Sequence, residues 1–342
     1  MEPSACNRIG LGKGDYSGHP STLCKGCGHD SITLAIIQAY YELAVPPHEI
    51  AKFSGIGCSS KTPTYFVERA HGFNGVHGRM PSLATGAQVA NRGLTLIGIS
   101  GDGDTASIGM GQYCHLIRRN LDMVYVIENN GTYGLTKGQF SATADQGSTA
   151  KKGAANPFPV IDCCAVAIEL GATFVARSFS GDRKQMIQLL KAAHSHRGLA
   201  VLDIISPCVT FNNHPGSTKS YSFAKDHDLP LHELGYVPEY ENIEVEMKEG
   251  EVRHIELHDG SHLTLKKLAP EEYDPQDKIK AIVGIEDARR KQQLTTGLLY
   301  YKADQKDLCG LMEMTDTPLC QLTESALDPG PEALDKINAA MR

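Results

Sequence analysis

The stretch that decides the fold reads Leu94-Thr95-Leu96-Ile97-Gly98-Ile99-Ser100-Gly101-Asp102-Gly103-Asp104. It begins with an apolar run of strand length, and the run ends at glycines that predict a turn. Residues 104–120 then predict a helix, with Ile108, Cys114 and Ile117 among its inward-facing positions. Residues 123–127 predict a second buried strand, so this part of the chain predicts a β-α-β unit.

Similar patterns continue along the chain. Helices are predicted over residues 31–45, 160–170 and 182–196, and strands over residues 173–176 and 199–205. Alternating strands and helices predict an α/β fold with a doubly wound, mostly parallel sheet. We expect residues 1–235 to form this main domain. A net charge of −7 gives no sign of nucleic-acid binding.

Asp102 and Asn130 follow the two strands of the first unit. Ligands of such sheets bind at the carboxyl ends of strands, so both side chains are expected at one edge. Mg²⁺ prefers oxygen ligands and often takes some of them from a bound phosphate. The Thr132 carbonyl is a third candidate ligand in the protein. Gly103 lets the backbone approach a phosphate, and the helix that follows favours negative charge. An Asp between glycines can also be only a turn, but the pair Asn129-Asn130 strengthens the metal interpretation.

Cysteine spacing predicts a second kind of site. The chain has ten cysteines, of which Cys24 and Cys27 form a C-x2-C, while Cys58 and Cys208 follow glycine- or proline-containing turns. One C-x2-C could bind zinc, but zinc ribbons usually have two such pairs. Four thiolates from separate loops can instead hold a 4Fe-4S cluster. The other cysteines lack ligand spacing and are expected to be buried or free thiols: Cys6, Cys114, Cys163, Cys164, Cys309 and Cys320.

The compartment is inferred from two absences. The sequence has no signal-peptide pattern and no apolar stretch of about 18 residues, so no membrane association is expected. We therefore expect a cytoplasmic protein, in which a disulfide framework would be unusual.

Several motifs together resemble those of one family. They are Leu23-Cys24-Lys25-Gly26-Cys27-Gly28-His29, Gly55-Ile56-Gly57-Cys58-Ser59-Ser60-Lys61, His77-Gly78-Arg79 with Ala84-Thr85-Gly86, Gly101-Asp102-Gly103-Asp104, Asn129-Asn130-Gly131-Thr132-Tyr133-Gly134-Leu135-Thr136-Lys137-Gly138-Gln139 and Ser206-Pro207-Cys208. Over residues 15–235 the chain resembles the β subunit of 2-oxoacid:ferredoxin oxidoreductases, and it is most similar to the 2-oxoglutarate (KorB-type) members. The family often has Trp and Pro where this chain has Leu23 and Lys25.

The resemblance implies a set of cofactor contacts. It implies that Asp102, Asn130 and Thr132 bind thiamine diphosphate through Mg²⁺, and that a 4Fe-4S cluster has the ligands Cys24, Cys27, Cys58 and Cys208. Implied contacts to thiamine diphosphate are Ile56, Gly57, Cys58, Ser59, His77, Gly103, Asp104, Gly134 and Leu135.

Three further side chains are candidates for catalysis. His29 is expected near the cofactor, Lys61 near the partner or a substrate carboxylate, and Lys137 on the substrate. Leu135 and Lys137 match positions linked to 2-oxo-acid recognition in the 2-oxoglutarate type. Plainer alternatives remain open: His29 as a turn residue, His77 as a loop histidine, and both lysines as solvated side chains.

The resemblance also implies a reaction and partners. The reaction converts 2-oxoglutarate, coenzyme A and oxidised ferredoxin to succinyl-CoA, CO2 and reduced ferredoxin, and it is reversible. Only the diphosphate module of a thiamine enzyme is visible, so an α subunit with the pyrimidine module is expected, as an α2β2 assembly. Two other functions are less consistent with the sequence: the four spaced cysteines argue against a thiamine enzyme without redox chemistry, and Asp102 with Asn130 argues against a non-catalytic zinc or cluster scaffold.

Residues 236–342 are expected to form a C-terminal extension that packs on the main body or wraps a partner. Alternation over residues 243–257, with turns at 249–250 and 258–261, predicts a hairpin or meander. A charged helix is predicted over residues 277–292. We expect Leu298, Leu299 and Tyr300 to contact the partner.

Overall fold

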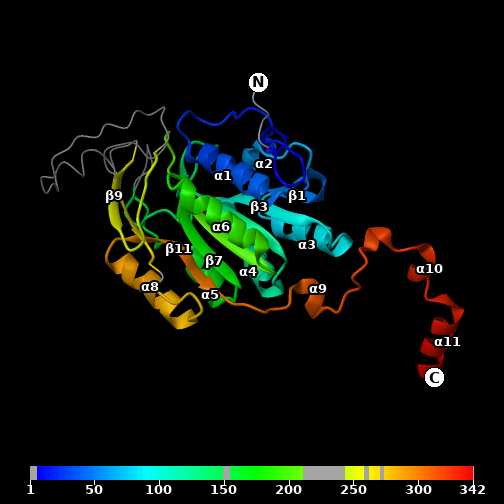
Figure 1. The fold of residues 1–342 in the computed structure, drawn as a ribbon. Helices are drawn as coiled ribbons and strands as arrows, with labels where there is room; N and C mark the ends of the chain where they lie inside the picture. The colour runs from blue at the N-terminus through cyan, green and yellow to red at the C-terminus, as the bar shows by residue number, and fades with distance from the viewer. Residues whose placement is uncertain (1–5, 149–154, 211–242, 258–261, 270–272, 342) are drawn as a thin grey trace, which may run out of the picture.

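The fold was obtained as a computed structural model, which describes residues 6–148, 155–210, 243–257, 262–269 and 273–341. Within these ranges one sheet has nine strands in the order β2-β1-β3-β4-β8-β7-β11-β10-β9 (Figure 1). All strands from β2 to β7 in this order are parallel to their neighbours. The remaining pairs are antiparallel, except that β10 is parallel to β11. The predicted doubly wound, mostly parallel α/β sheet is confirmed.

The strands are β1 (Ile50–Ser54), β2 (His71–Asn74), β3 (Thr95–Gly101), β4 (Met123–Asn129), β7 (Phe174–Phe179), β8 (Leu199–Ile205), β9 (Val252–Glu256), β10 (His262–Lys267) and β11 (Leu294–Tyr301). A separate two-stranded ribbon consists of β5 (Thr132–Tyr133) and β6 (Gln139–Phe140). The main helices are α1 (Gly28–Leu43), α2 (Thr62–Tyr65), α3 (Met80–Ala90), α4 (Met110–Arg119), α5 (Cys163–Glu169), α6 (Arg183–Ser195), α8 (Lys278–Arg290), α9 (Leu308–Leu311), α10 (Glu324–Leu327) and α11 (Gly330–Ala340).

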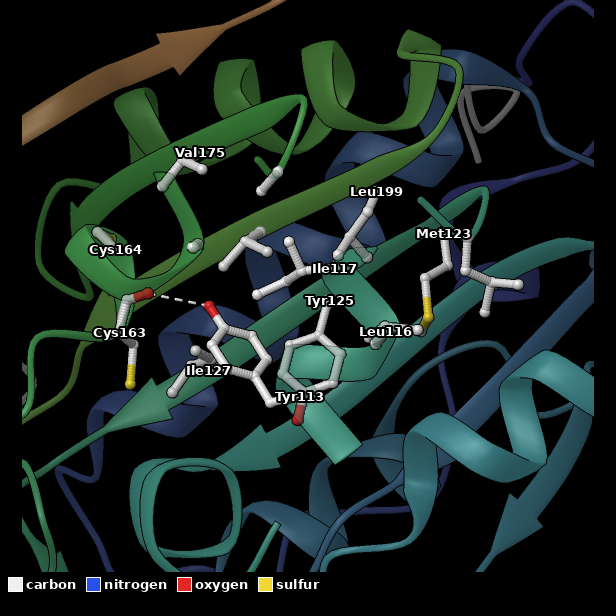
Figure 2. Packing of buried hydrophobic residues seen from close by; sticks show 14 of the residues in the cluster. Tyr113, Leu116, Ile117, Met123, Tyr125, Ile127, Cys163, Cys164, Val175 and Leu199 are labelled. Atoms are coloured by element: carbon white, nitrogen blue, oxygen red, sulfur yellow. Dashed lines mark hydrogen bonds between the residues drawn. The ribbon is translucent and has the colours of Figure 1, made fainter. Parts of the chain in front are cut away.

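Helices cover both faces of the sheet because the central strands are apolar on both sides. On β4, Met123, Tyr125 and Ile127 join one core cluster, while Val124 and Val126 join the other. The first cluster packs under α3, α4, α5 and α8, and the second under α1 and α6. Figure 2 shows part of the first cluster, where the Tyr113 hydroxyl donates to the backbone carbonyl of Cys163 at 3.0 Å.

The helix predicted over residues 104–120 is interrupted. Asp104–Ile108 forms a π-helical turn, and α4 begins only after Gly109. The Gly109 N–H donates to the Asp104 carbonyl at 2.7 Å, five residues back, which widens the turn. The inward prediction holds for the buried Ile117, Cys114 is half-buried, and the prediction for Ile108 is wrong because Ile108 is 45% exposed.

The C-terminal extension adds strands to the main sheet. β9 and β10 pair as the predicted hairpin, although its turn at 258–261 lies outside the described residues. β11 pairs antiparallel with β7, and Leu299 and Tyr300 are buried in the first core cluster. Their prediction as partner contacts is therefore wrong, and the half-buried Leu298 packs against the second cluster.

The end of the chain leaves the sheet. The boundary predicted near residue 235 lies outside the described residues, and the sheet includes strands from both sides of it. After β11, α9 lies under the body, whereas α10 and α11 extend away from it (Figure 1). Arg92 holds the start of this arm, because its guanidinium donates to the carbonyls of Met314 and Thr315 at 3.0 and 2.9 Å.

Candidate active site

Four neighbouring strands bring the predicted site residues to one edge of the sheet. β1, β3, β4 and β8 are adjacent and parallel, so their carboxyl ends lie side by side. Cys58 follows β1, Asp102 follows β3, Asn130 follows β4, and Cys208 follows β8. The fold thus gathers loops that are far apart in the sequence, as expected for a binding edge of an open α/β sheet.

Asp102 is the centre of the predicted metal site. It is 1% exposed, and its Oδ1 accepts the Asn130 N–H at 3.3 Å. Its Oδ2 accepts the hydroxyls of Ser141 and Thr143. The Asn130 Oδ1 accepts the Thr132 N–H at 3.0 Å, so the three predicted ligand residues lie together.

Burial raises the pKa of Asp102, and the hydroxyl donors only partly oppose this effect. A carboxylate in such a place is stabilised by a cation. These oxygen-bearing residues fit a Mg²⁺ ion with a diphosphate as its remaining ligand.

Glycine is required at position 103 for a contact within the protein. The Tyr133 hydroxyl donates to the Gly103 carbonyl at 2.9 Å. A Cβ on Gly103 would stand 2.5 Å from the Tyr133 ring, closer than packed atoms approach. Tyr133 therefore rests on the turn that carries Asp102.

Asp104 joins the loop of His77 to the same edge. Its Oδ1 accepts the Gly78 N–H at 2.7 Å, and its Oδ2 accepts the Ser100 hydroxyl at 3.0 Å. Gly78 has a φ of +69°, and a Cβ there would lie 2.9 Å from the Gly109 backbone. The Asp104 carboxylate is thus engaged within the protein, while His77 is exposed. Their contacts with a cofactor stay predictions.

The loop after β1 rests on the Gly101-Asp102-Gly103-Asp104 turn. The Ser59 hydroxyl donates to the Ile56 carbonyl at 2.9 Å, and Ser59 is buried. A Cβ on Gly101 would stand 3.0 Å from the Ser59 Oγ. Gly57 has a φ of +84°, which a residue with a side chain rarely adopts.

The predicted cluster ligands come from three segments near that loop. Cys27 is the N-cap of α1, and Cys58 precedes the short helical turn Ser59–Lys61. A Cβ on Gly134 would lie 3.4 Å from the Cys58 Sγ and 3.7 Å from the Cys208 Sγ. The Thr210 hydroxyl lies 3.4 Å from the Cys24 Sγ.

Electrostatics also link these thiols. Burial, followed by the charges of Cys208 and Cys24, raises the pKa of the Cys58 thiol. Burial raises the pKa of the Cys27 thiol too, with Glu128 and Cys208 among the further causes. Cys27, Cys58 and Cys208 are half-buried and Cys24 is exposed, and thiolates gathered in one place are stabilised by a cation.

A cluster and a zinc ion are the two metal groups that the cysteine pattern suggests. In the described part of the chain, no group of three or more His, Cys, Asp or Glu side chains is placed to hold a single metal ion. A 4Fe-4S cluster has one thiolate on each iron, so its ligands stand further apart than those of one zinc ion. The assignment of the four cysteines to a 4Fe-4S cluster stays a prediction.

A buried polar cluster lies among these segments and was not predicted. Glu128, at 0% exposure, accepts the Thr62 hydroxyl at 3.0 Å from both carboxyl oxygens. The His29 Nε2 lies 3.7 Å from the Glu128 Oε2, and the His29 Nδ1 lies 2.8 Å from the Ser206 Oγ. These contacts connect segments that carry Cys27, Cys58 and Cys208.

Burial sets the charge state favoured in this cluster. It lowers the pKa of His29 to about 4 and raises the pKa of Glu128 well above its ordinary value. Both groups are therefore favoured in their neutral forms. His29 lies inside α1 and is not a turn residue.

Leu135 and Lys137 lie on the turn between β5 and β6. Leu135 is 54% exposed, and Lys137 is exposed with a φ of +80°. The turn begins at Tyr133 and is closed by the Gly138 N–H, which donates to the Tyr133 carbonyl at 3.0 Å. Lys61 is half-buried three residues after Cys58. The roles of these residues in substrate binding stay predictions.

Known proteins resemble the chain in this region and beyond. The family model of the thiamine pyrophosphate enzyme C-terminal TPP binding domain matches residues 55–204. A β subunit of 2-oxoacid:ferredoxin oxidoreductase from Sulfolobus is 38% identical over 221 residues, which cover 64% of this chain and 70% of the relative. The chain belongs to the β-subunit family of 2-oxoacid:ferredoxin oxidoreductases.

A solved member of this enzyme class has the same fold. A 2-oxoglutarate:ferredoxin oxidoreductase from Magnetococcus marinus, with 2-oxoglutarate, coenzyme A and succinyl-CoA bound, is 30% identical with a TM-score of 0.71. The similarity covers 97% of this chain and 96% of that chain. The predicted family and the thiamine-diphosphate type of α/β domain are confirmed.

Matches to other curated relatives span less of their length. A β subunit from Aeropyrum pernix is 43% identical over 60% of its length, and a 2-oxoglutarate oxidoreductase subunit KorB from Mycobacterium tuberculosis is 40% identical over 51%. Each of these two matches covers 56% of this chain.

Glu128, Thr62 and Ser206 are site residues that the sequence analysis missed. A signal exists for Glu128, because it is a charged residue that directly continues the apolar run of β4. Thr62 and Ser206 carry no comparable signal. Among helices in the described ranges of this β subunit, none combines the length and apolarity that crossing a membrane requires.

Proposed function

We propose that this chain is the β subunit of a 2-oxoglutarate:ferredoxin oxidoreductase. The enzyme converts 2-oxoglutarate, coenzyme A and oxidised ferredoxin to succinyl-CoA, CO2 and reduced ferredoxin, and the reaction is reversible. The observation that carries the proposal is the position of Gly134, four residues after Asn130 and against the sulfurs of Cys58 and Cys208. The loop that leaves the metal site thereby touches the thiols of the expected cluster.

Thiamine diphosphate, when bound, supplies a nucleophilic carbon and an electron sink for the 2-oxo acid. In the proposal Asp102, Asn130 and the Thr132 carbonyl hold Mg²⁺ on its diphosphate. The turns at Gly57 and Gly103 allow close backbone approach. Tyr133 and Ser59, packed on the same turn, exclude water from it and fix its shape.

A 4Fe-4S cluster bound by Cys24, Cys27, Cys58 and Cys208 would accept electrons singly and pass them to ferredoxin. The residues near Glu128 hold the cysteine-bearing segments together without a net charge. Lys25 and Lys61 place positive charge near the same thiols. We place the enzyme in the cytoplasm, where coenzyme A and ferredoxin are available.

The proposed partner is an α subunit with the pyrimidine-binding module, in an α2β2 assembly. Support comes from the C-terminal arm, whose apolar side chains are 49–83% exposed at Leu319, Leu327, Leu334, Ile337 and Met341. We expect a partner subunit to cover these exposed apolar side chains in the assembly. This arm, and not β11, is therefore the part of residues 236–342 that we expect to wrap the partner.

The chain alone is expected to be inactive. Without the α subunit, the group that activates the thiamine ring is missing, so purified chain with ferredoxin, coenzyme A and 2-oxoglutarate should give no succinyl-CoA. Adding the α subunit should restore turnover. Full turnover by the highly purified chain alone would refute the proposed assembly.

Lys137→Ala is expected to lower kcat/KM for 2-oxoglutarate at least about tenfold. The ammonium sits on an exposed turn that starts at the metal site, where it can pair with the distal carboxylate of the substrate. Breaking such a pair on one side costs roughly 2–5 kcal/mol, and about 1.4 kcal/mol is already a factor of ten. Pyruvate lacks the distal carboxylate and should be affected less.

The measurement is the ratio of kcat/KM for 2-oxoglutarate and pyruvate in wild-type and Lys137→Ala complexes. Lys248→Ala, on an exposed turn of the extension, is the matched control and should leave the ratio unchanged. An unchanged ratio in Lys137→Ala would show that Lys137 does not determine the preference between the two substrates. A wild-type preference for pyruvate would contradict the substrate assignment.

A further inference from the structure

A chain of polar contacts supports Asp102 from one side. The Thr143 Oγ1 lies 2.6 Å from the Asp102 Oδ2 and 3.0 Å from the Asn129 Oδ1. The Asn129 Nδ2 donates to the Asp203 Oδ1 at 3.0 Å, and the Arg177 Nε donates to the Asp203 Oδ2 at 3.0 Å. This series of hydrogen bonds thus runs from β4 across β8 to β7, near the carboxyl ends of the strands.

The end of this hydrogen-bond series that lies farthest from Asp102 is fixed in the core. The Arg177 Nη2 donates to the Asp162 Oδ1 at 2.7 Å, and Asp162 also caps α5 by accepting the Ala165 N–H at 3.0 Å. Arg177 is 3% exposed and Asp203 is 1% exposed. A charged group in this position moves little, because every displacement would break hydrogen bonds that water cannot replace.

The direction of the hydrogen bonds follows from this anchor. Asp203 requires a donor, so the Asn129 amide must turn its Nδ2 toward Asp203 and its Oδ1 toward Thr143. The single Thr143 hydrogen then faces the Asp102 Oδ2 and the Asn129 Oδ1, and also the Ser141 Oγ at 2.9 Å, whose own hydrogen goes to Asp102. The contact to Asp102 is shorter and is assisted by charge, so it is the stronger one.

We infer that Thr143 is a positioning residue for the magnesium ligand Asp102. Thr143 and Ser141 both donate to Oδ2, while Oδ1 accepts only the long bond from Asn130 among the described contacts. The two hydroxyls would hold the Asp102 carboxylate in a fixed orientation in which it could bind the cation. This inference rests on the proposed function and adds residues that hold the metal ligand in place.

The test uses the complete complex after removal of thiamine diphosphate and Mg²⁺. Mg²⁺ is titrated at saturating thiamine diphosphate, and bound thiamine diphosphate is measured by equilibrium dialysis. Thr143→Val, which keeps the shape but removes the hydroxyl, should raise the Mg²⁺ concentration at half-saturation by about 10- to 100-fold. Thr143→Ser keeps the hydroxyl and should restore affinity to within about threefold of wild type.

Thr173→Val is the control for general damage. Thr173 is buried at the opposite ends of the strands, and its hydroxyl bonds to Asn120 at 2.9 Å and His196 at 2.7 Å. This control should lower the unfolding temperature of the cofactor-free complex without changing Mg²⁺ affinity. If Thr143→Val does not assemble, Ser141→Ala removes the other donor to Oδ2 and should weaken Mg²⁺ binding in the same direction.

Two failures are distinguishable. Thiamine diphosphate binding that depends on Mg²⁺ in wild type but is unchanged in Thr143→Val would overturn this inference alone. A wild-type complex that binds no thiamine diphosphate in the presence of Mg²⁺ would overturn the proposed function together with it.

Discussion

Replacing Asp102 with alanine is expected to abolish retention of thiamine diphosphate while the iron content stays unchanged. Asp102 is the one carboxylate among the three expected Mg²⁺ ligands, and Mg²⁺ binding depends on negatively charged oxygen. The four cysteines lie on loops other than the one that carries Asp102, so the cluster should persist. Thiamine diphosphate and iron are measured on the complete complex after anaerobic gel filtration in Mg²⁺ buffer.

Asp122→Ala is the matched control for this experiment. Asp122 directly precedes β4 at its amino end, away from the site, where it accepts the Gly198 N–H at 3.2 Å. That variant should retain the cofactor. Normal thiamine diphosphate affinity in Asp102→Ala would show that Mg²⁺ is held elsewhere.

Replacing Cys208 with alanine is expected to remove the 4Fe-4S cluster. Wild-type complex should contain about four irons per β chain, the composition of one cluster. Loss of one thiolate leaves an iron without its protein ligand, and the variant should lose most of its iron, its sulfide and its visible absorbance. Iron, zinc and acid-labile sulfide are measured on anaerobically purified complex.

Cys320→Ala serves as the control, because Cys320 is exposed on the arm and lies far along the chain from the motif cysteines. Its cluster should be normal. Stoichiometric zinc in wild type would reject the cluster, and a normal cluster spectrum in Cys208→Ala would reject this residue as a ligand.

The parallel core of the fold could be predicted because its signals are local. Residues 199–205 are apolar except for Asp203, and they become β8 with the predicted bounds. The helix predicted over residues 182–196 is α6, which Asp182 caps, and its apolar Met186, Leu189 and Leu190 are buried. Since strands β1, β3, β4 and β8 are neighbours, their following loops had to meet.

Features that depend on distant contacts could not be predicted. The π-helical turn at Asp104 arises where Gly109 meets Gly78, a contact between segments about thirty residues apart. Leu299 and Tyr300 are apolar whether they face a partner or pair with β7, so sequence alone did not distinguish the two. The contact of Thr143 with Asp102 likewise exists only after the chain has folded over β4.

In the proposed function, electrons pass from substrate at a thiamine diphosphate site to a cluster held by this same chain. The most direct measurement is the electron paramagnetic resonance spectrum of the oxidised complex after anaerobic addition of 2-oxoglutarate and coenzyme A without ferredoxin. We expect the signal of a reduced 4Fe-4S cluster in wild type and its absence in Asp102→Ala. Release of CO2 and succinyl-CoA by wild type without any cluster reduction would contradict it.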